Sequence, residues 1–145
     1  MTLTHEYLRD FVARHRYGVL ATNSASGAPE SALVGIAVSP ALEIYFDTVD
    51  TTRKVANLRR DPRASFVIGW ENEQTLQLEG VADEPKGAAL AELKKIYFAA
   101  WPDGPDREKW KGITYYRMRP TWLRFSSYVD PELIEEMTLD GPKAF

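Results

Sequence analysis

The sequence predicts a mainly β domain, an antiparallel barrel of about six strands with peripheral helices. Short segments rich in β-branched and aromatic residues alternate with clusters of turn residues, as expected for strands and their connections. Three other segments repeat apolar residues at helical spacing. The 145 residues contain no repeat, low-complexity tract or linker, so we expect residues 1–145 to form a single domain.

The first half of the chain contains the first helix and three of the expected strands. Leu8, Phe11 and Val12 share one face of a helix over residues 4–15, and Gly18 ends that helix. The turn at residues 24–29 and Pro40 separate a meander of three strands, over residues 19–22, 30–38 and 42–46.

The second half contains two helices and the remaining strands. A helix over residues 52–60 ends at Asp61-Pro62, because proline disfavours helical backbone in the residue before it. Asp83-Glu84-Pro85 resembles the cap and first turn of a helix that continues to about Tyr97. The remaining segments are strands over residues 64–70 and 76–81, one or two long strands over residues 113–128 that Pro120 interrupts, a loop at residues 102–105 and a short acidic tail after Asp130.

Composition excludes several classes of function. A net charge of −3 provides no basic field to attract nucleic acid. The absence of cysteine excludes disulfides, thiolate metal sites and cysteine nucleophiles. His5 and His15, the two histidines, have no acidic cluster beside them, so we expect no metal site. No segment approaches the roughly 20 apolar residues of a membrane span, and we expect a cytoplasmic protein with no nucleic-acid or membrane partner.

The segment Thr52-Arg53-Lys54 is the most informative for function. Thr52 is a suitable N-cap, which places Arg53 and Lys54 in the first turn of the expected helix. Cations there oppose the helix dipole at a cost of about 0.3–1 kcal/mol each, and a bound anion reverses that sign. Free backbone N–H groups, a hydroxyl and two cations form a cradle suited to phosphate. The alternative is an ordinary solvated basic turn.

Several motifs together resemble the pyridoxamine 5′-phosphate oxidase-like family of split barrels that bind flavin mononucleotide (FMN). They are Gly18-Val19-Leu20-Ala21-Thr22, Gly27-Ala28-Pro29, and the run from Tyr45 to Ser65 that contains Thr52-Arg53-Lys54. The resemblance covers residues 8–125. It implies a six-stranded antiparallel split β-barrel that forms a homodimer, with FMN bound at the interface between the two copies.

The resemblance also assigns cofactor contacts. Thr52, Arg53 and Lys54 match the phosphate-binding positions, and Ala32 replaces a second phosphate-binding arginine of the oxidase. The flavin ring would lie along Leu33, Val34 and Gly35, with further contacts from Phe46, Asp47 and either Gln74 or Thr75.

At the substrate side the sequence departs from the oxidase. Tyr97 matches a tyrosine that binds the substrate phosphate, but Ala37 and Trp101 replace its cationic partners. We therefore predict that pyridoxamine phosphate is not the substrate, since a phosphate dianion requires cationic donors. Tyr97, Trp101 and Trp122 instead suit a planar or apolar ligand, although large aromatics also occur in cores and interfaces.

Three hypotheses for function follow. The first is a flavin-dependent oxidoreductase acting on an unknown small molecule, with FMN, or alternatively the deazaflavin F420, as cofactor and no identifiable catalytic side chain. The second is a non-catalytic module that binds flavin or heme for storage, sensing or stress response. For heme, both histidines fall on the first expected helix and neither suggests an axial ligand. The third is a cofactor-free interaction barrel.

Overall fold

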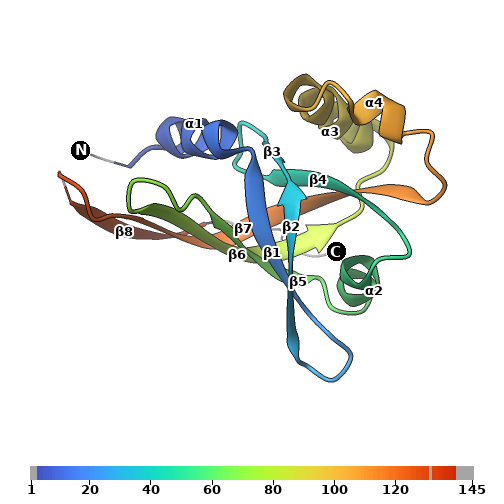
Figure 1. The fold of residues 1–145 in the computed structure, drawn as a ribbon, viewed down its shortest axis with the longest axis horizontal. Coiled ribbons are helices and arrows are strands. Elements are labelled where there is room, and N and C mark those ends of the chain that lie inside the picture. Colours follow the sequence, from blue (N-terminus) through green and yellow to red (C-terminus); the bar gives the residue numbers. More distant parts are fainter. Residues whose placement is uncertain (1–2, 131, 140–145) are drawn as a thin grey trace.

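An eight-stranded antiparallel sheet that curls around a hydrophobic core organises the chain (Figure 1). The structure is a computed structural model and describes residues 3–130 and 132–139. In these residues the helices are α1 (His5–His15), α2 (Arg53–Arg60), α3 (Gly87–Ala100) and α4 (Gly104–Arg107). The strands are β1 (Tyr17–Asn23), β2 (Pro29–Gly35), β3 (Ala37–Val38), β4 (Ile44–Val49), β5 (Arg63–Ile68), β6 (Gln74–Asp83), β7 (Ile113–Ser127) and β8 (Leu133–Thr138).

The order of the strands explains the curl. Neighbours in the sheet follow the order β2-β1-β5-β6-β7-β4-β3, and β8 pairs with β7. β2 and β3 form the two ends of this order, yet only Ile36 separates them in the chain. The two ends of the sheet are therefore held side by side, which bends it into a barrel. In Figure 1, α1 and α3 lie toward the top of the view and α2 lies below, beside the β1–β2 hairpin.

The predicted fold class is confirmed, while the number of strands differs from six. The expected strand over residues 30–38 is divided at Ile36. The backbone N–H of Ile36 donates a hydrogen bond to the carbonyl oxygen of Arg16 at 2.8 Å. β8 forms in the tail where no element was expected. Its alternate residues are half-buried, and it extends the edge of β7 beyond the part that pairs with β4.

Two further expectations at helix boundaries are wrong. The loop at residues 102–105 contains the start of α4. α3 begins at Gly87 with Lys86 as its N-cap, so Asp83-Glu84-Pro85 is not a helix start. Asp83 instead belongs to β6 and pairs with Arg117 at 2.8 Å, because arginines on other elements take up the acidic groups of this segment.

β7 is one continuous strand, despite Pro120. Pro120 pairs with Gly80 of β6 beside a bulge between Glu79 and Gly80. A Cβ atom at Gly80 would overlap the backbone oxygen of Arg119, so only glycine permits this close approach.

The core consists of two clusters of buried side chains. The larger fills the curled sheet and includes Phe46, which is fully buried and stacks on Tyr116 with ring centroids 5.5 Å apart. The smaller lies under α3 and includes Tyr45, Leu93 and Tyr97. The smaller cluster fixes α3 against β3 and β4, and so shapes the part of the molecule where the predicted ligand residues lie.

Glu84 joins α2 to β7. Its carboxylate accepts two hydrogen bonds from Arg59, at 2.9 and 3.0 Å. Thr114 Oγ1 and the Tyr116 hydroxyl donate to the same carboxylate at 2.8 and 3.0 Å. These donors stabilise the charged form, with Arg59 the largest contributor, and lower the pKa of Glu84 to about 2.

We expect Glu84→Gln to lower the free energy of unfolding at pH 7 by about 1.5–3 kcal/mol, the range for hydrogen bonds to charged groups. The pKa of Glu84 is about 2 in the folded chain and near its ordinary 4.5 when unfolded. The stabilisation is therefore present above pH 4.5 and declines as pH falls toward 2. Urea titrations of both proteins between pH 7 and 3 measure the effect. Glu92→Gln, at an exposed position on α3, is the control, and a loss independent of pH would contradict the assignment.

Candidate functional site

Two of the three predicted anion-binding residues, Arg53 and Lys54, line one cavity, and Thr52 does not. The volume of this cavity is about 200 Å³, and Arg53 and Lys54 form its wall together with Thr22, Glu30 and Ser31. Arg53 and Lys54 come from the first turn of α2, while the other residues come from β1 and β2. The structure therefore brings the two cations of the motif to the junction between a helix N-terminus and the edge of the sheet.

The start of α2 leaves its N-terminal charge unopposed within the helix. Thr52 is the N-cap with extended backbone, but its hydroxyl makes no capping hydrogen bond and lies 3.3 Å from Thr48 Oγ1. The first turn contains no acidic residue. Lys54 is half-buried at this position, and burial lowers its pKa. An anion in the cavity would meet a helix N-terminus and two cations.

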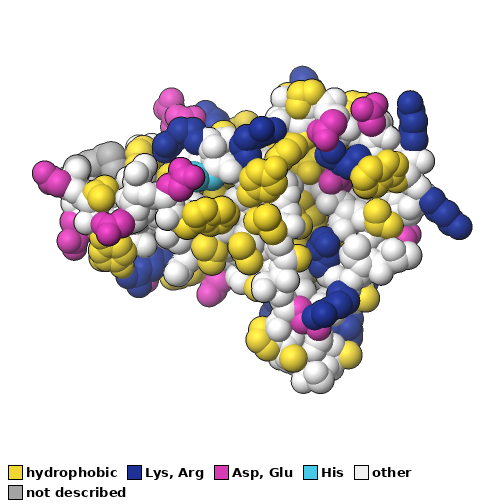
Figure 2. All heavy atoms as spheres, in the orientation of Figure 1, with side chains coloured by type: hydrophobic (Ala, Val, Ile, Leu, Met, Phe, Trp, Pro, Cys, Tyr) yellow, Lys and Arg dark blue, Asp and Glu magenta, His cyan; other side chains and the backbone are white. Residues whose placement is uncertain are grey.

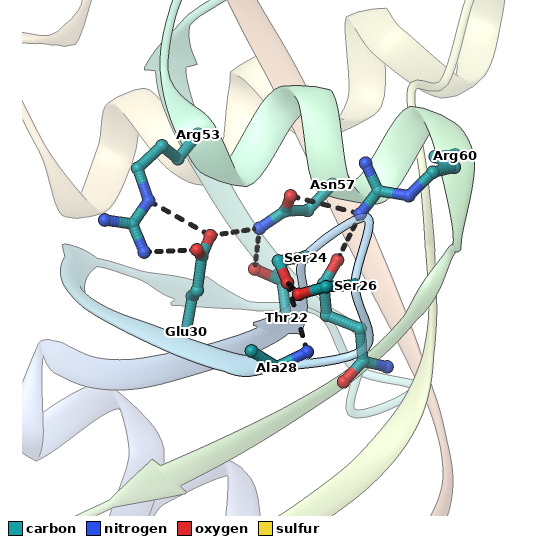
Figure 3. A network of polar contacts seen from close by, with 9 residues as sticks. Thr22, Ser24, Ser26, Ala28, Glu30, Arg53, Asn57 and Arg60 are labelled. Carbon is teal, nitrogen blue, oxygen red and sulfur yellow. Dashed lines mark hydrogen bonds and ion pairs between the residues drawn. The ribbon is translucent and has the colours of Figure 1, made fainter.

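Glu30 forms an ion pair with Arg53 in this structure (Figure 3). Arg53 Nε donates to Glu30 Oε1 at 3.0 Å, and its Nη2 pairs with the other carboxylate oxygen. Asn57 Nδ2 also donates to Glu30 Oε1, at 2.7 Å. Asn57 and Arg53 together lower the pKa of Glu30 below its ordinary value.

Asn57 is the fixed centre of this network. It is 5% exposed, and it donates to Thr22 Oγ1 at 3.0 Å. Its Oδ1 accepts a hydrogen bond from Arg60 Nη2 at 3.2 Å, as Figure 3 shows. Sequence reasoning did not identify Glu30 or Asn57 as site residues. The spacing of Arg53 and Asn57, four residues apart in a helix, is the signal that places both on one face.

The strand expected to carry the flavin ring presents three different environments. Leu33 is 62% exposed, whereas Val34 is buried in the core. A Cβ atom at Gly35 would lie 2.7 Å from the ring carbon Cζ2 of Trp101, so the absence of a side chain there lets the indole approach. Of these residues, Leu33 alone offers an exposed side chain to a ligand.

Phe46 and Asp47, also expected at the cofactor, are engaged inside the chain. Phe46 is fully buried in the core, so its side chain is not available to a ligand. Asp47 accepts a hydrogen bond from Arg107 Nε at 2.8 Å. The Tyr97 hydroxyl lies 3.2 Å from Asp47 and 3.0 Å from the Gly35 oxygen.

The structure brings Tyr97 and Trp101 together and leaves Trp122 elsewhere. Tyr97 is 1% exposed, and burial raises its pKa. Trp101 donates from Nε1 to the Ile36 oxygen at 2.9 Å, and the Arg16 guanidinium lies 4.2 Å from its ring centroid. Trp122 stands on β7, paired with β6 and β8.

Gln74 and Thr75 lie at the start of β6 and do not line the anion cavity of their own chain. Gln74 Nε2 donates to Ser127 Oγ at 3.3 Å, and Thr75 pairs with Ser126.

The outer face of the sheet carries a row of apolar side chains. Val19 of β1 lies between Leu33 of β2 and Val67 of β5 in the strand register. Leu33 and Val67 are 62% and 40% exposed, and Tyr17 nearby on β1 is 43% exposed. Figure 2 shows hydrophobic side chains gathered over β1 and β2 on this side of the molecule.

Within residues 3–130 and 132–139, no three His, Cys, Asp or Glu side chains converge in a way that suits a metal ion. His15 packs on Phe11 with ring centroids 4.4 Å apart, and burial lowers its pKa. None of the described helices has the length and apolar character needed to cross a membrane.

Comparison with protein families places this site in context. The model of the pyridoxamine 5′-phosphate oxidase family matches residues 4–127, which include the whole anion cavity. No curated protein matches the chain.

Solved structures share the fold. The heme binding protein from Mycobacterium smegmatis is 21% identical with a TM-score of 0.80; the match covers 95% of this chain, which spans 59% of that protein's length. A conserved hypothetical protein from Mycobacterium tuberculosis is 25% identical with a TM-score of 0.74, covering 99% of this chain and 96% of the other. HutZ, the heme storage protein from Vibrio cholerae, is 16% identical with a TM-score of 0.69, covering 79% and 88%.

We expect Gly35→Ala to destabilise the chain by about 1–3 kcal/mol, because the new methyl group would press against the Trp101 ring. In a Trp101→Ala background the same substitution has room and should cost far less. Urea unfolding of the four proteins in this double-mutant cycle measures the coupling. An equal cost in both backgrounds would show that Trp101 is not the obstacle.

Proposed function

We propose that this chain, which belongs to the pyridoxamine 5′-phosphate oxidase family, binds FMN. In this proposal it acts as a flavin-dependent oxidoreductase on a small planar or apolar substrate. The observation that carries the proposal is the cavity at the N-terminus of α2, where Arg53 and Lys54 meet. We further propose that the protein works in the cytoplasm, which the absence of cysteine favours.

The donor set suits a phosphate monoester. Arg53 presents a planar fork of N–H donors, and Lys54 supplies a second cation from a half-buried position. The open backbone N–H groups at the start of α2 add donors of the same sign. In our proposal Thr52, Arg53 and Lys54 hold the flavin phosphate, and this grip sets the position of the rest of the cofactor.

The exposed apolar row suits the rest of the ligand and a second copy of the chain. Its side chains point to the opposite face of β1 and β2 from Leu20 and Thr22, which line the cavity, so a ligand would reach the row around the β2 edge. Val19, Leu33 and Val67 provide an apolar surface next to the strand proposed to carry the ring. We propose that two chains meet on this face, so that Gln74 or Thr75 of one copy reaches the ligand held by the other. Burial of this row removes apolar surface from water, which favours both contacts.

The proposed chemistry belongs to the cofactor, which when bound accepts or donates hydride. Asp47 is engaged by Arg107 and Tyr97, so these residues act as a rigid support for Gly35 and not as a free acid or base. Trp101 closes one side of Gly35 and excludes water from it. We propose that substrate approaches along Trp101, which the buried Tyr97 supports from the core side, with Trp122 contributed by the second copy.

A second candidate is a binding module without turnover, for heme, flavin or F420. The names of two structural relatives favour heme, since one is a heme binding protein and the other a heme storage protein. In this chain, His15 packs on Phe11 and His5 is exposed on α1, and neither faces the anion cavity. The absorption spectrum of protein loaded with each cofactor identifies the one that it retains, and reduction and reoxidation of a bound flavin by nicotinamide donors and electron acceptors would show turnover and count against the second candidate.

We expect wild-type protein to retain FMN after desalting. We expect the double variant Arg53→Ala, Lys54→Ala to bind FMN with an affinity at least about 100-fold lower. Hydrogen bonds to charged groups contribute about 1.5–3 kcal/mol each, and 1.4 kcal/mol is tenfold in affinity. Visible flavin absorption and fluorescence titration measure the loss.

The control for this variant is Arg14→Ala with Lys109→Ala, which removes the same charge from exposed positions outside the cavity. Failure of the wild-type protein to bind FMN would overturn the flavin proposal. Retention of heme in its place would favour the second candidate.

We expect Val67→Glu to convert a dimer into a monomer, because it places a charge in the apolar row, next to Val19. Sedimentation velocity measures the change, and Trp110→Glu, at a 55% exposed position outside the row, is the control. A monomeric wild-type protein, or a Val67→Glu dimer as stable as wild type, would contradict the proposed interface.

A further inference from the structure

Glu30 places a carboxylate inside a cavity whose other charged groups are cations. Its two oxygens bind Nε and Nη2 of Arg53, and Asn57 donates to one of the same oxygens. Among the described residues, no acidic side chain forms an ion pair with Lys54. The structure thus holds one neutralised cation and one uncompensated cation in a single pocket.

The ion pair between Glu30 and Arg53 can be replaced readily by other contacts. The Arg53 side chain is 76% exposed and that of Glu30 is 23% exposed, so water can replace each partner. Ion pairs of this exposure contribute little to stability. Asn57, in contrast, is buried and held by Thr22 and Arg60, so it keeps its position when the carboxylate leaves.

We propose that Glu30 is an internal competitor for anions in this pocket: it occupies Arg53 in the empty protein, and a phosphate group enters by displacing it. This inference rests on the proposed function of the cavity. After displacement, Arg53 Nε and Asn57 Nδ2 are both donors without their former acceptor, and both point at the space that the carboxylate occupied. Asn57 thereby becomes an additional ligand of the phosphate, one that sequence motifs did not identify.

This pocket favours phosphate over carboxylate ligands. A phosphate monoester carries a charge of about −1.5 to −2 at pH 7 and has three acceptor oxygens, so it can bind Arg53, Lys54 and Asn57 at once. A carboxylate ligand can form with Arg53 only the same contacts that the Glu30 carboxylate already forms. Displacing Glu30 costs every ligand the same free energy, so the preference for phosphate comes from its additional contacts with Lys54 and Asn57. The common cost lowers the affinity of the weaker carboxylate ligands to the point where they do not bind measurably.

The test compares wild-type protein with Glu30→Gln, which keeps an acceptor for Asn57 and removes the charge. Glu92→Gln makes the same change of net charge at an exposed position on α3 and is the matched control. FMN binding is followed by fluorescence. Inorganic phosphate and acetate are titrated separately while the backbone amide signals of Arg53 and Lys54 are followed by NMR.

We expect Glu30→Gln to bind FMN and inorganic phosphate about tenfold more tightly than wild type, the scale of one charged hydrogen bond. Acetate should shift the Arg53 and Lys54 signals in Glu30→Gln and leave them unchanged in wild type. Glu92→Gln should match wild type throughout. Glu30→Ala gives the same direction of change if the glutamine variant folds poorly.

The outcomes separate this inference from the proposed function. Equal FMN affinity in wild type and Glu30→Gln overturns the role of Glu30 and leaves the flavin proposal standing. Tighter binding of inorganic phosphate by Glu30→Gln, with no FMN binding by any variant, supports the role of Glu30 and overturns the flavin proposal. Absence of both ligands from every variant overturns both.

Discussion

The rest of the structure depends on the double pairing of one segment, residues 29–38. Its first part, β2, pairs with β1, and its last two residues, β3, pair with β4. Because both ends of the sheet belong to this one segment, the sheet cannot lie flat. The same segment carries Glu30 at the anion cavity, Leu33 on the outer face and Gly35 against Trp101. The double pairing of this segment therefore both bends the sheet into a barrel and positions the residues of the site.

Arginine–carboxylate pairs join different elements of this barrel and connect two of its helices to the strands. Arg107 on α4 reaches Asp47 on β4, and Arg117 on β7 reaches Asp83 on β6. α2 is held at both ends, by Arg59 on Glu84 and by Arg53 on Glu30. These pairs differ in exposure: Arg107 and Asp47 are mostly buried, whereas Arg53 is largely in water. The pairs that are mostly buried stabilise the fold, and the exposed pair at the cavity is the one that a ligand can exchange.

Much of this fold was predictable from local chemistry, and the remainder was not. Alternating and β-branched residues predicted the barrel strands, and Thr52-Arg53-Lys54 predicted that two cations would line one pocket. β8 escaped prediction because its glutamates conceal the alternation of Leu133 and Met137. Asp83-Glu84-Pro85 satisfied the local rules for a helix start, yet distant arginines took its carboxylates. Glu30 was missed for the same reason, since its meaning lies in Arg53 and Asn57, which are adjacent only after folding.

The register between β4 and β7 has a consequence for how the chain folds. The hairpin of β1 and β2 can form early. Ile44 cannot pair with Met118, nor Val49 with Ile113, until β7 is present. Closure is thus a late event that joins distant parts of the chain, and proteins rich in such non-local pairings fold in milliseconds to seconds. During synthesis, the edge of β4 that pairs with β7 stays open until the last third of the chain has been made.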